Sequence, residues 1–518
     1  MSGADELDEA IALANSGRAR PAPPPAPRLK RIRRIQWSEH SEDAMHPDPA
    51  AHTDDGREGA GGTGHGGRED DDAGNTGAER TGRTDPGRHP RDPAEAAHEH
   101  GTGGPPRQEG RAHRNAPSWY EAVECAASAA TALPPTTLPL SDALGHTLAV
   151  PLRALTDLPP FDTSAMDGWA VSGPGPWELA RAADGGERPG ILAGDRSEPP
   201  QLADGEAIRI ATGARVPPGT SAVLRREAAE RIGAVRLRTA APPQPGTDIR
   251  PRGQECREGD GLLPPGTAVT PAVLGLAAAA GYDELEVVPR PRVEVLVLGD
   301  ELLHRGLPRD GRIRDALGPM VGPWLTALGA EVSATRLLGD DAGALRARLA
   351  ASTADVVVTT GGTASGPVDH LQPTLRGLDA GLLVHGVRVR PGHPMLLAVL
   401  ERTQSRPRRT FVVGLPGNPL AALSGLVTLA APLLRVLAGR PAPEVRKATL
   451  GAEVSGHPRD TRLVPVRHEG WGVRARVRPL RYAGPAMLRG VASCDALAVV
   501  PPGGAAPGED VPVLELPW

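Results

Sequence analysis

Residues 292–437 constrain the fold most, because apolar strands alternate there with helices in a regular order. The predicted strands are RVEVLVLG (292–299), EVSATRLLG (331–339), ADVVVTTGG (354–362), LLVHGVRVR (382–390) and TFVVGLPG (410–417). The predicted helices are PMVGPWLTALG (319–329), whose start is limited by Pro323, AGALRARLAAS (342–352) and a long helix from Asn418. Strands that are apolar almost throughout are buried on both faces. The alternation therefore predicts an α/β domain over 291–440, with a parallel sheet covered by helices on both sides.

The region before this domain, residues 117–290, mixes helical and β-rich segments. A helix is predicted over 121–133, where Pro134 and Pro135 follow, and residues 141–155 are predicted to form a second helix that runs into an extended segment. Residues of about 160–265 are rich in proline and glycine, with short alternating runs such as AIRIATG and AVRLRTA, which predicts an inserted β-rich module. A further helix is predicted to start with Thr270 as N-cap and Pro271 at N1, and to end before Gly281.

The two ends of the chain differ sharply in composition. Residues 445–518 contain several short alternating strands and predict a small β domain. Residues 1–115 consist mainly of glycine, proline and charged residues, so they bury too little apolar surface to fold and are predicted to be disordered. The basic run RLKRIRRIQW (28–37) within this tail is either a docking peptide for an acidic partner or nucleic acid or, as we favour, a solvated patch.

Charge and cysteine usage exclude several classes of protein. The net charge of −5 gives no reason to expect a nucleic acid or an anionic membrane as partner. The three cysteines form no CxxC pair, which is typical of a reducing compartment, and we expect the cytoplasm. The longest apolar run, 419–439, is interrupted by Pro432 and Arg435, so we interpret it as a buried helix rather than a membrane span.

Polar and glycine-rich turns follow several of the predicted strands. VVVTTGGTASG (356–366) is a strand that ends in a glycine turn, which is either a phosphate-binding loop or a tight structural turn. LGDEL (298–302), GDD (339–341) and VDH (368–370) place acids after strands, where they are either helix caps or ligands of Mg²⁺ beside a substrate phosphate. RVRPGHP (388–394) supplies Arg390 and His393 for an anion, and GLPGNP (414–419) is both a helix start and a possible anion site.

One short segment combines aromatic and acidic residues in a chain that has few aromatic residues. DLPPFDTSAMDGWAV (157–171) contains one of the two phenylalanines of the chain and a tryptophan, with Asp162 and Asp167 set among small residues and glycine. PPFDTSAMDGWAV resembles the PxFDNSAMDGYA signature of the molybdopterin molybdenumtransferases, the molybdenum insertases that include the bacterial MoeA type and the gephyrin E domain. ATGARVPPGT, IRPRGQE, GDEL, GDD, ADVVVTTGG, RPGHP and GLPGNP follow in the family's order, so the resemblance covers about residues 117–518.

The resemblance implies a reaction and an assembly. The family takes adenylylated molybdopterin and molybdate, releases AMP and inserts molybdenum into the dithiolene. Its cleft is shared between the subunits of a homodimer, so a homodimer is expected here. The resemblance makes Asp167 a site acid, with Phe161 and Trp169 anchoring its loop, whereas Asp162 is interpreted as the cap of a turn.

The resemblance also carries roles to individual residues. It implies that Asp167, Glu301, Asp340 and Asp369 are catalytic and that the last three bind Mg²⁺. It implies that the ligands are bound by Thr212, Glu255, Gly361, Gly362, Thr363, Gly366, Arg390, His393, Pro394, Pro416, Gly417, Asn418, Arg462 and Arg467.

The sequence departs from the family at the groups that bind anions. The family's KPGKP is RPGHP here, so Arg390 and His393 replace two lysines. Leu298 and Ala421 replace hydroxyl residues, Pro485 stands where a serine is expected, His370 replaces a tyrosine and Glu255 replaces an aspartate. Three hypotheses follow: an active insertase with a remodelled anion pocket, a non-catalytic paralogue that binds molybdopterin or partners a true insertase, and a different phosphate enzyme on the same fold.

Overall fold

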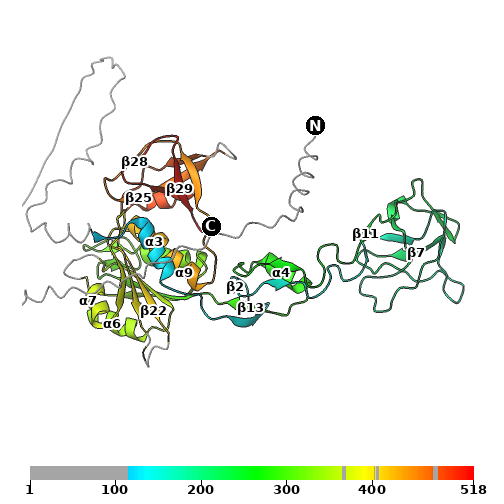
Figure 1. Cartoon of the computed structure of the whole chain (residues 1–518), viewed down its shortest axis with the longest axis horizontal. Coiled ribbons are helices and arrows are strands. Elements are labelled where there is room, and N and C mark those ends of the chain that lie inside the picture. Colours follow the sequence, from blue (N-terminus) through cyan, green and yellow to red (C-terminus); the bar gives the residue numbers. More distant parts are fainter. Residues whose placement is uncertain (1–114, 364–368, 402, 404–407, 471–475) are drawn as a thin grey trace, which may run out of the picture. The chain divides into compact units, whose positions relative to one another are not determined.

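The structure is a computed structural model, and it describes residues 115–363, 369–401, 403, 408–470 and 476–518 (Figure 1). The predicted disordered tail and its basic run therefore lie outside the described residues, apart from residue 115. The described chain contains an α/β domain with a six-stranded sheet, smaller sheets before it and a β domain after it. The multidomain α/β plus β fold class predicted from the sequence is confirmed.

The central sheet has the strand order β17-β14-β18-β22-β21-β19. Its strands are β14 (Arg292–Leu298), β17 (Glu331–Leu338), β18 (Val356–Thr360), β19 (Gly381–His385), β21 (Leu396–Leu400) and β22 (Thr410–Leu415). The first four strands in the spatial order are parallel, as predicted, but β21 is antiparallel to both of its neighbours. The sheet is therefore mixed at one end.

Strand structure predicted near LLVHGVRVR (382–390) is present, but it is divided into two short strands. Gly386, with φ of 69°, ends β19, and the chain then forms β20 (Val389–Arg390), which pairs with the C-terminal domain instead of the central sheet. Glycine at this position allows the left-handed turn that a strand interior does not permit. The strand β21 was not predicted at all.

Helices cover the sheet on both faces, as the apolar strands predict. Val293, Val295 and Val297 of β14 belong to one core cluster with α3 (Trp119–Ser128) and α5 (Leu317–Ala327). Glu294 points to the opposite face, where it pairs with Arg348 of α6 (Ala342–Ala351). Successive side chains of a strand alternate between faces, so these two sets of contacts define the two helix layers.

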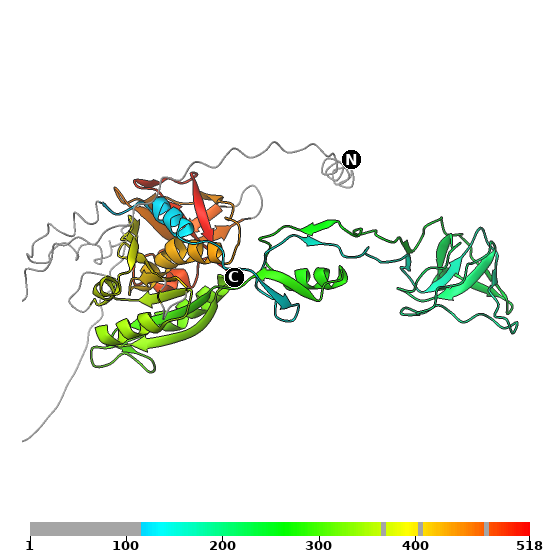
Figure 2. The same ribbon diagram turned by 60° about the horizontal axis from the view of Figure 1, so that its bottom comes forward.

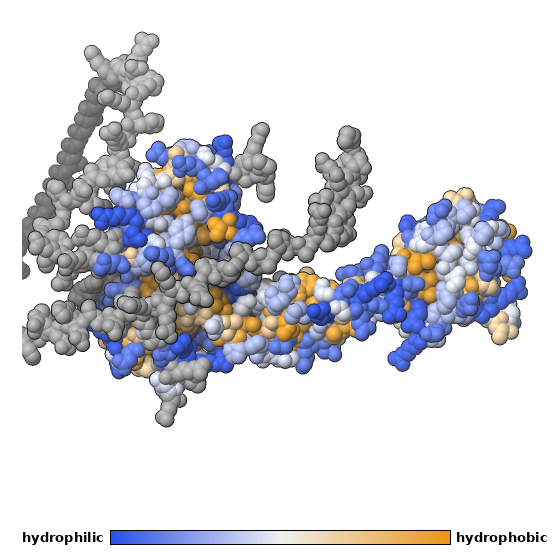
Figure 3. Space-filling view, in the orientation of Figure 1, coloured by the Kyte–Doolittle hydropathy of each residue, from blue (hydrophilic) through white to orange (hydrophobic). Residues whose placement is uncertain are grey.

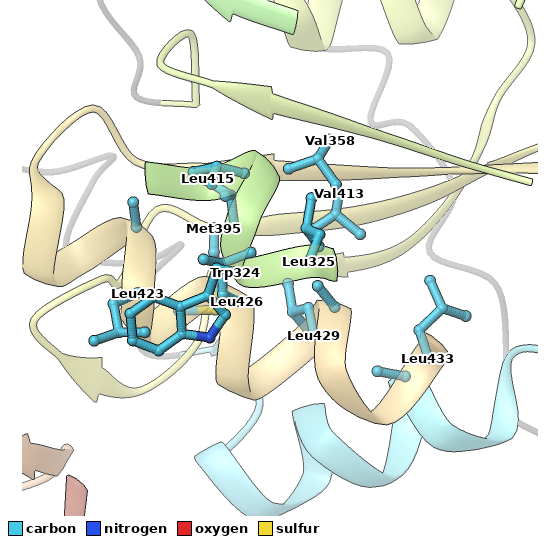
Figure 4. Packing of buried hydrophobic residues seen from close by; sticks show 14 of the residues in the cluster. Trp324, Leu325, Val358, Met395, Val413, Leu415, Leu423, Leu426, Leu429 and Leu433 are labelled. Atoms are coloured by element: carbon cyan, nitrogen blue, oxygen red, sulfur yellow. The ribbon is translucent and has the colours of Figure 1, made fainter. Parts of the chain in front are cut away.

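The long helix from residue 419 is the central core helix of the domain. It comprises α8 (Pro419–Gly425), a π-helical segment η3 (Leu426–Ala430) and α9 (Ala431–Leu437), and Leu423, Leu426, Leu429 and Leu433 pack beneath the sheet (Figure 4). It is apolar and long enough to cross a membrane, but 78% of its most apolar window is buried inside the protein. The prediction of a buried helix is confirmed.

Three other helix predictions have different outcomes. α5 begins before Pro323, because the Asp315 carboxylate accepts the amide of Gly318 at 2.9 Å and fixes the first turn. α3 ends at Ser128, earlier than predicted. The helix predicted at the start of 141–155 is wrong, because Gly145 has φ of 80° and the segment begins with turns. The extended continuation agrees with the strands β2 (Thr147–Leu148) and β3 (Leu152–Arg153).

The region before the central domain contains a small module and an inserted β-rich module. The small module has the sheet β1-β13-β2, from β1 (Thr136–Pro139), β13 (Glu284–Val288) and β2, together with α4 (Pro271–Ala279). Thr270 caps α4 through the amide of Val273, and Gly281 has φ of 100°, as the sequence predicts.

The inserted module has the six-stranded sheet order β8-β5-β7-β6-β10-β9. Its strands are β5 (Gly168–Val171), β6 (Trp177–Leu179), β7 (Glu206–Ile210), β8 (Ala222–Arg225), β9 (Glu230–Ile232) and β10 (Arg236–Arg238).

The C-terminal domain is a closed ring of strands. β25 (Thr461–Glu469) pairs with both β26 (Arg476–Pro479) and β27 (Ala496–Val500), and β23 (Arg446–Leu450) and β29 (Asp510–Glu515) complete the ring. β20 lies along β25 at its edge, and Figure 2 shows this domain beside the central one. Each of these strands overlaps a segment predicted from the alternating pattern.

Leu429→Ala tests the core helix. Leu429 is fully buried in η3, so its truncation should cost about 2–5 kcal/mol, the range for buried leucines. The unfolding midpoint in urea should fall accordingly. Leu307→Ala is the matched control, because that side chain is 84% exposed and its loss should leave the midpoint almost unchanged. Equal shifts for the two variants would contradict the assigned core.

Candidate active site

Two glycine turns meet at the carboxyl ends of β18 and β22. Thr360 and Leu415 are register partners, and the amide of Gly361 donates to the Leu415 carbonyl at 2.9 Å. A Cβ atom on Gly417 would lie 3.9 Å from Gly361 Cα. The structure therefore brings Gly361, Gly362 and Thr363 next to Pro416, Gly417 and Asn418, whereas Gly366 lies outside the described residues.

Both glycines of the first turn are required by the backbone. Gly361 and Gly362 have φ of 84° and 68°, in the left-handed region. A Cβ atom on either one would approach Leu298, at 3.3 Å from its carbonyl oxygen and 3.2 Å from its Cδ1. The amides of Gly362 and Thr363 have no acceptor within the described residues, so two N–H donors remain for a ligand.

Acidic side chains follow two neighbouring strands at the same edge. The Asp300 amide, after β14, donates to Asp340 Oδ2 at 3.4 Å, and the Asp340 amide, after β17, donates to Asp300 Oδ1 at 3.3 Å. Asp341 is the N-cap of α6, which is the structural role that the sequence left open for these acids. Asp300 is therefore the partner of Asp340, whereas the resemblance gives a metal-binding role to Glu301 and none to Asp300.

The three acids predicted to bind Mg²⁺ do not form a closed ligand set. The Glu301 carboxylate folds back over Gly299, Asp340 is directed at Asp300, and Asp369 precedes α7 (Leu371–Gly377). Within the described residues, no three His, Cys, Asp or Glu side chains are grouped as metal ligands. Mg²⁺ needs only one or two carboxylates when substrate phosphates and water supply the remaining ligands, so the acids of this edge fit that mode of binding.

Two arginines lie side by side where the central and C-terminal domains pair. β20 runs parallel to β25, and Arg390 is the register partner of Arg462. Arg390 Nε donates to Asp460 Oδ2 at 2.8 Å, and Arg462 donates to the Ser455 carbonyl. Asp460 was not predicted, because an isolated acid before a strand carries no motif.

Other predicted ligands have structural partners instead. His393 Nδ1 lies 2.8 Å from the Val387 carbonyl, and Arg467 donates to the Ser493 carbonyl at 2.8 and 3.1 Å. The first contact fixes the ring of His393 against the chain that leads into its own turn, and Pro394 follows it. Glu255 is exposed, and its amide donates to the Leu158 carbonyl at 2.9 Å.

Asp167 and Thr212 meet in the inserted module. The amide and the hydroxyl of Thr212 donate to Asp167 Oδ1 at 2.7 and 3.1 Å. These two hydrogen bonds, the amide first, lower the pKa of Asp167 below its usual range, and Arg226 and Arg209 add to the effect. Among the described residues, the hydrogen-bond partners of Asp167 and Thr212 lie inside the module. The lowered pKa keeps the carboxylate ionised near neutral pH, and the side chain is held at the module's surface.

The aromatic residues of the same segment hold its loop. The Arg215 guanidinium lies 4.5 Å from the centre of the Phe161 ring, and the partly buried Trp169 packs against the module's core. Asp162 Oδ1 accepts the amide of Arg252 at 2.7 Å. Asp162 therefore has a structural role, as expected, but it holds a turn 90 residues away rather than its own.

Comparisons of the sequence and of the structure with known proteins identify the same group of relatives. Three family models match in order: the MoeA N-terminal region (domains I and II) over 118–281, a probable molybdopterin binding domain over 294–436 and the MoeA C-terminal region (domain IV) over 447–516. Molybdopterin molybdenumtransferase 2 of Mycobacterium tuberculosis (strain H37Rv) is 36% identical over 391 residues, which cover 71% of this chain and 91% of that protein. The chain belongs to the molybdopterin molybdenumtransferase (MoeA) family.

More distant relatives in this family extend the match. A molybdopterin molybdenumtransferase of Staphylococcus aureus (strain COL) is 28% identical over 394 residues, which cover 74% of this chain and 91% of that protein. The crystal structure of a molybdopterin biosynthesis MoeA protein of Pyrococcus horikoshii is 26% identical with a TM-score of 0.60, and the match covers 78% of this chain and 99% of that one. The family fold is thus present over the described domains.

The departures from the family motifs have visible structural consequences. Leu298, in place of a hydroxyl residue, is 9% exposed and packs under the turn at Gly361 and Gly362. The amides of Leu420 and Ala421, in the first turn of α8, donate to the Pro485 carbonyl at 2.9 and 3.4 Å. A backbone carbonyl therefore occupies the helix start that the sequence offered as an anion site.

Gly392→Ala tests how tightly the RPGHP turn is seated. Gly392 has φ of 112°, and a Cβ atom there would lie 2.9 Å from both the Ala421 carbonyl oxygen and Ser424 Cβ. Gly306→Ala is the matched control, because Gly306 has φ of 81° and open space around it. The control should lose about 1–2 kcal/mol of stability from the left-handed backbone, and Gly392→Ala about 1–3 kcal/mol more from overpacking. Urea unfolding measures both, and equal losses would show that the turn can move away from α8.

Proposed function

We propose that this chain inserts molybdenum from molybdate into adenylylated molybdopterin and releases AMP. Membership of the family makes it a transferase of molybdenum cofactor biosynthesis. The observation that carries the finer proposal is the edge of the central sheet, where two glycine turns and the acids after β14 and β17 follow neighbouring strands. Ligands of open α/β sheets bind at this edge.

The glycine turn is suited to the phosphates of the adenylate. The amides of Gly362 and Thr363 supply donors without an internal acceptor, and the absence of Cβ atoms lets a phosphate approach the backbone. Water hydrolyses the phosphoanhydride of the adenylate, which releases AMP. The two dithiolene thiols bind molybdenum as an oxygen of molybdate takes up their protons and leaves as water. The protein has to bind both the adenylate and molybdate, and its positive groups have to offset the repulsion between the phosphates and the molybdate dianion.

We include Mg²⁺ in the proposal, with Glu301, Asp340 and Asp369 as the groups that would hold it. When bound, the ion neutralises phosphate charge and polarises a bound water. The reciprocal hydrogen bonds of Asp300 and Asp340 keep one of these carboxylates at the edge. Arg390 and Arg462 are the candidates to bind molybdate, since paired guanidinium groups match the oxygens of an oxyanion.

We propose that the active unit is a homodimer. Among the described residues, Asp167 and Thr212 hydrogen bond within the inserted module. In the proposed homodimer, the central and C-terminal domains of the other subunit supply the remaining groups of their site. Hydrophobic residues gather over the small module that contains α4 and β13 (Figure 3). Leu144, Val150 and Leu155 of this region are 50%, 42% and 52% exposed, which favours burial against another subunit.

A cytoplasmic setting is part of the proposal. Cys125, Cys256 and Cys494 carry no disulfide, which suits a reducing compartment. Burial raises the pKa of Cys494 to about 11, so this thiol is kept protonated and unreactive.

AMP release tests the proposed reaction. The purified chain should release AMP from adenylylated molybdopterin in a manner that depends on both molybdate and Mg²⁺. Asp369→Asn should lower the rate at least about 10–100-fold, the loss seen when groups that support a metal site are removed. Asp379→Asn is the control, because Asp379 is exposed in a turn with φ of 53° that asparagine tolerates, and its rate should be unchanged. Tight binding of the adenylate without any AMP release would support the non-catalytic paralogue instead.

The molar mass in solution tests the homodimer. Light scattering should give twice the 53.8 kDa of the chain. Leu155→Glu should shift the mass toward the monomer, because it would bury a charge without a partner. Val445→Glu, at a residue that is 73% exposed outside the patch, should remain dimeric. A wild-type chain that is monomeric at micromolar concentration would refute the dimer.

A further inference from the structure

The guanidinium of Arg390 is held by an acid that no motif of the sequence includes. Arg390 Nε donates to Asp460 Oδ2 at 2.8 Å. The carboxylate is 0% exposed, whereas the arginine side chain is 48% exposed. A buried carboxylate is costly unless it is paired, so this contact fixes one side of a cation whose other side faces outward.

His457 also lies at this carboxylate, but its geometry shows that it is not a donor to Asp460. His457 Nδ1 lies 3.3 Å from Asp460 Oδ2. The same ring nitrogen accepts the amides of Arg459 and Asp460 at 3.3 and 3.1 Å. A nitrogen that accepts N–H groups carries no proton of its own, so it cannot also donate to Asp460.

The strands fix where the held guanidinium lies. Arg390 is the register partner of Arg462 on parallel strands, so the two side chains leave the sheet on the same side. The turn that follows cannot shift easily, because Gly392 is seated against Ala421 and Ser424 of α8. Two cations are thus placed side by side, and Asp460 offsets part of their repulsion.

We propose that Asp460 is a positioning residue that turns Arg390 so that its two terminal nitrogens face a tetrahedral oxyanion beside Arg462. The inference rests on the proposed function, because the oxyanion is taken to be the molybdate substrate. Asp460 occupies the Nε side of the guanidinium. The Nη groups have no partner among the described residues and form a fork that can donate to two oxygens of one anion.

This arrangement explains why arginine rather than lysine suits position 390. A lysine ammonium has one nitrogen, so pairing it with Asp460 would draw its charge away from the ligand. An arginine can donate to Asp460 with Nε and still present two donors in a fixed plane. The acid and the arginine therefore form a functional pair, in which Asp460 acts on the oxyanion only through Arg390.

Equilibrium dialysis with labelled molybdate, in the presence of AMP and Mg²⁺, tests the inference without requiring turnover. The full chain is compared with Asp460→Asn, Arg390→Lys and the double variant. We expect Asp460→Asn to weaken the Kd for molybdate about tenfold or more, the effect of misaligning a charged hydrogen bond. The double variant should bind no more weakly than Arg390→Lys alone, because the two residues act as one unit.

A matched control separates positioning from stability. Glu294 is also a buried carboxylate that accepts an arginine Nε, from Arg336 at 3.1 Å, but it lies in the middle of β14 under α6. Glu294→Gln should lower the thermal midpoint and leave the Kd for molybdate unchanged. If Asp460→Asn lowered the midpoint but bound molybdate like the wild type, Asp460 would be structural only and the inference would be refuted.

The same samples distinguish failure of the inference from failure of the proposed function. A wild-type chain that binds no molybdate refutes the inference, whatever its activity. A wild-type chain that binds molybdate through the Arg390–Asp460 pair but releases no AMP upholds the inference and refutes the insertase. Additive losses of affinity in the double variant would show that Asp460 does not act through Arg390.

Discussion

The site depends on the register of the parallel strands β14, β18 and β22. Val297 pairs with Thr360, and Thr360 pairs with Leu415, so three strands end at the same height and their following turns meet. The hydrogen bond from the Gly361 amide to the Leu415 carbonyl then fixes one glycine turn against the other. A shift of one residue between these strands would reverse every side chain and separate the acids from the turns.

The sequence predicts the layers of the fold well because buried strands and helices carry apolar residues in a characteristic pattern. Strands that are apolar on both faces could only belong to a covered sheet, and the caps of α4 could be placed to the residue from Thr270, Pro271 and Gly281. The failures lie where one glycine decides between continuous structure and a turn. Gly145 ends a predicted helix and Gly386 divides a predicted strand, and both positions depend on tertiary context rather than on local pattern.

The sequence indicated candidate site residues but not most of their contacts. In the structure Asp167 accepts hydrogen bonds from Thr212, and the amide of Gly361 donates to the Leu415 carbonyl. The groups that the sequence did not reveal act through contacts without a motif. Pro485 contributes a backbone carbonyl, which any residue could supply, and Asp460 is a single acid whose partner is 70 residues away. Neither contact leaves a spacing that a reader of the sequence could recognise.

The two unpredicted contacts have a common consequence for how an anion can be held. The Pro485 carbonyl takes the amides of Leu420 and Ala421, so the positive end of α8 is already satisfied by the protein. His393 Nδ1 is directed at the Val387 carbonyl, which ties the ring to the backbone. The resemblance places a serine at position 421 and a lysine at position 393, and both donors are absent here. Under the proposed function, the binding of molybdate would then rely on the guanidinium groups of Arg390 and Arg462, whose charge does not depend on pH. The additional nitrogens of an arginine strengthen the binding of an oxyanion only when the two Nη groups face it. The buried carboxylate beside Arg390 is therefore the feature that makes the replacement of lysine by arginine physically coherent.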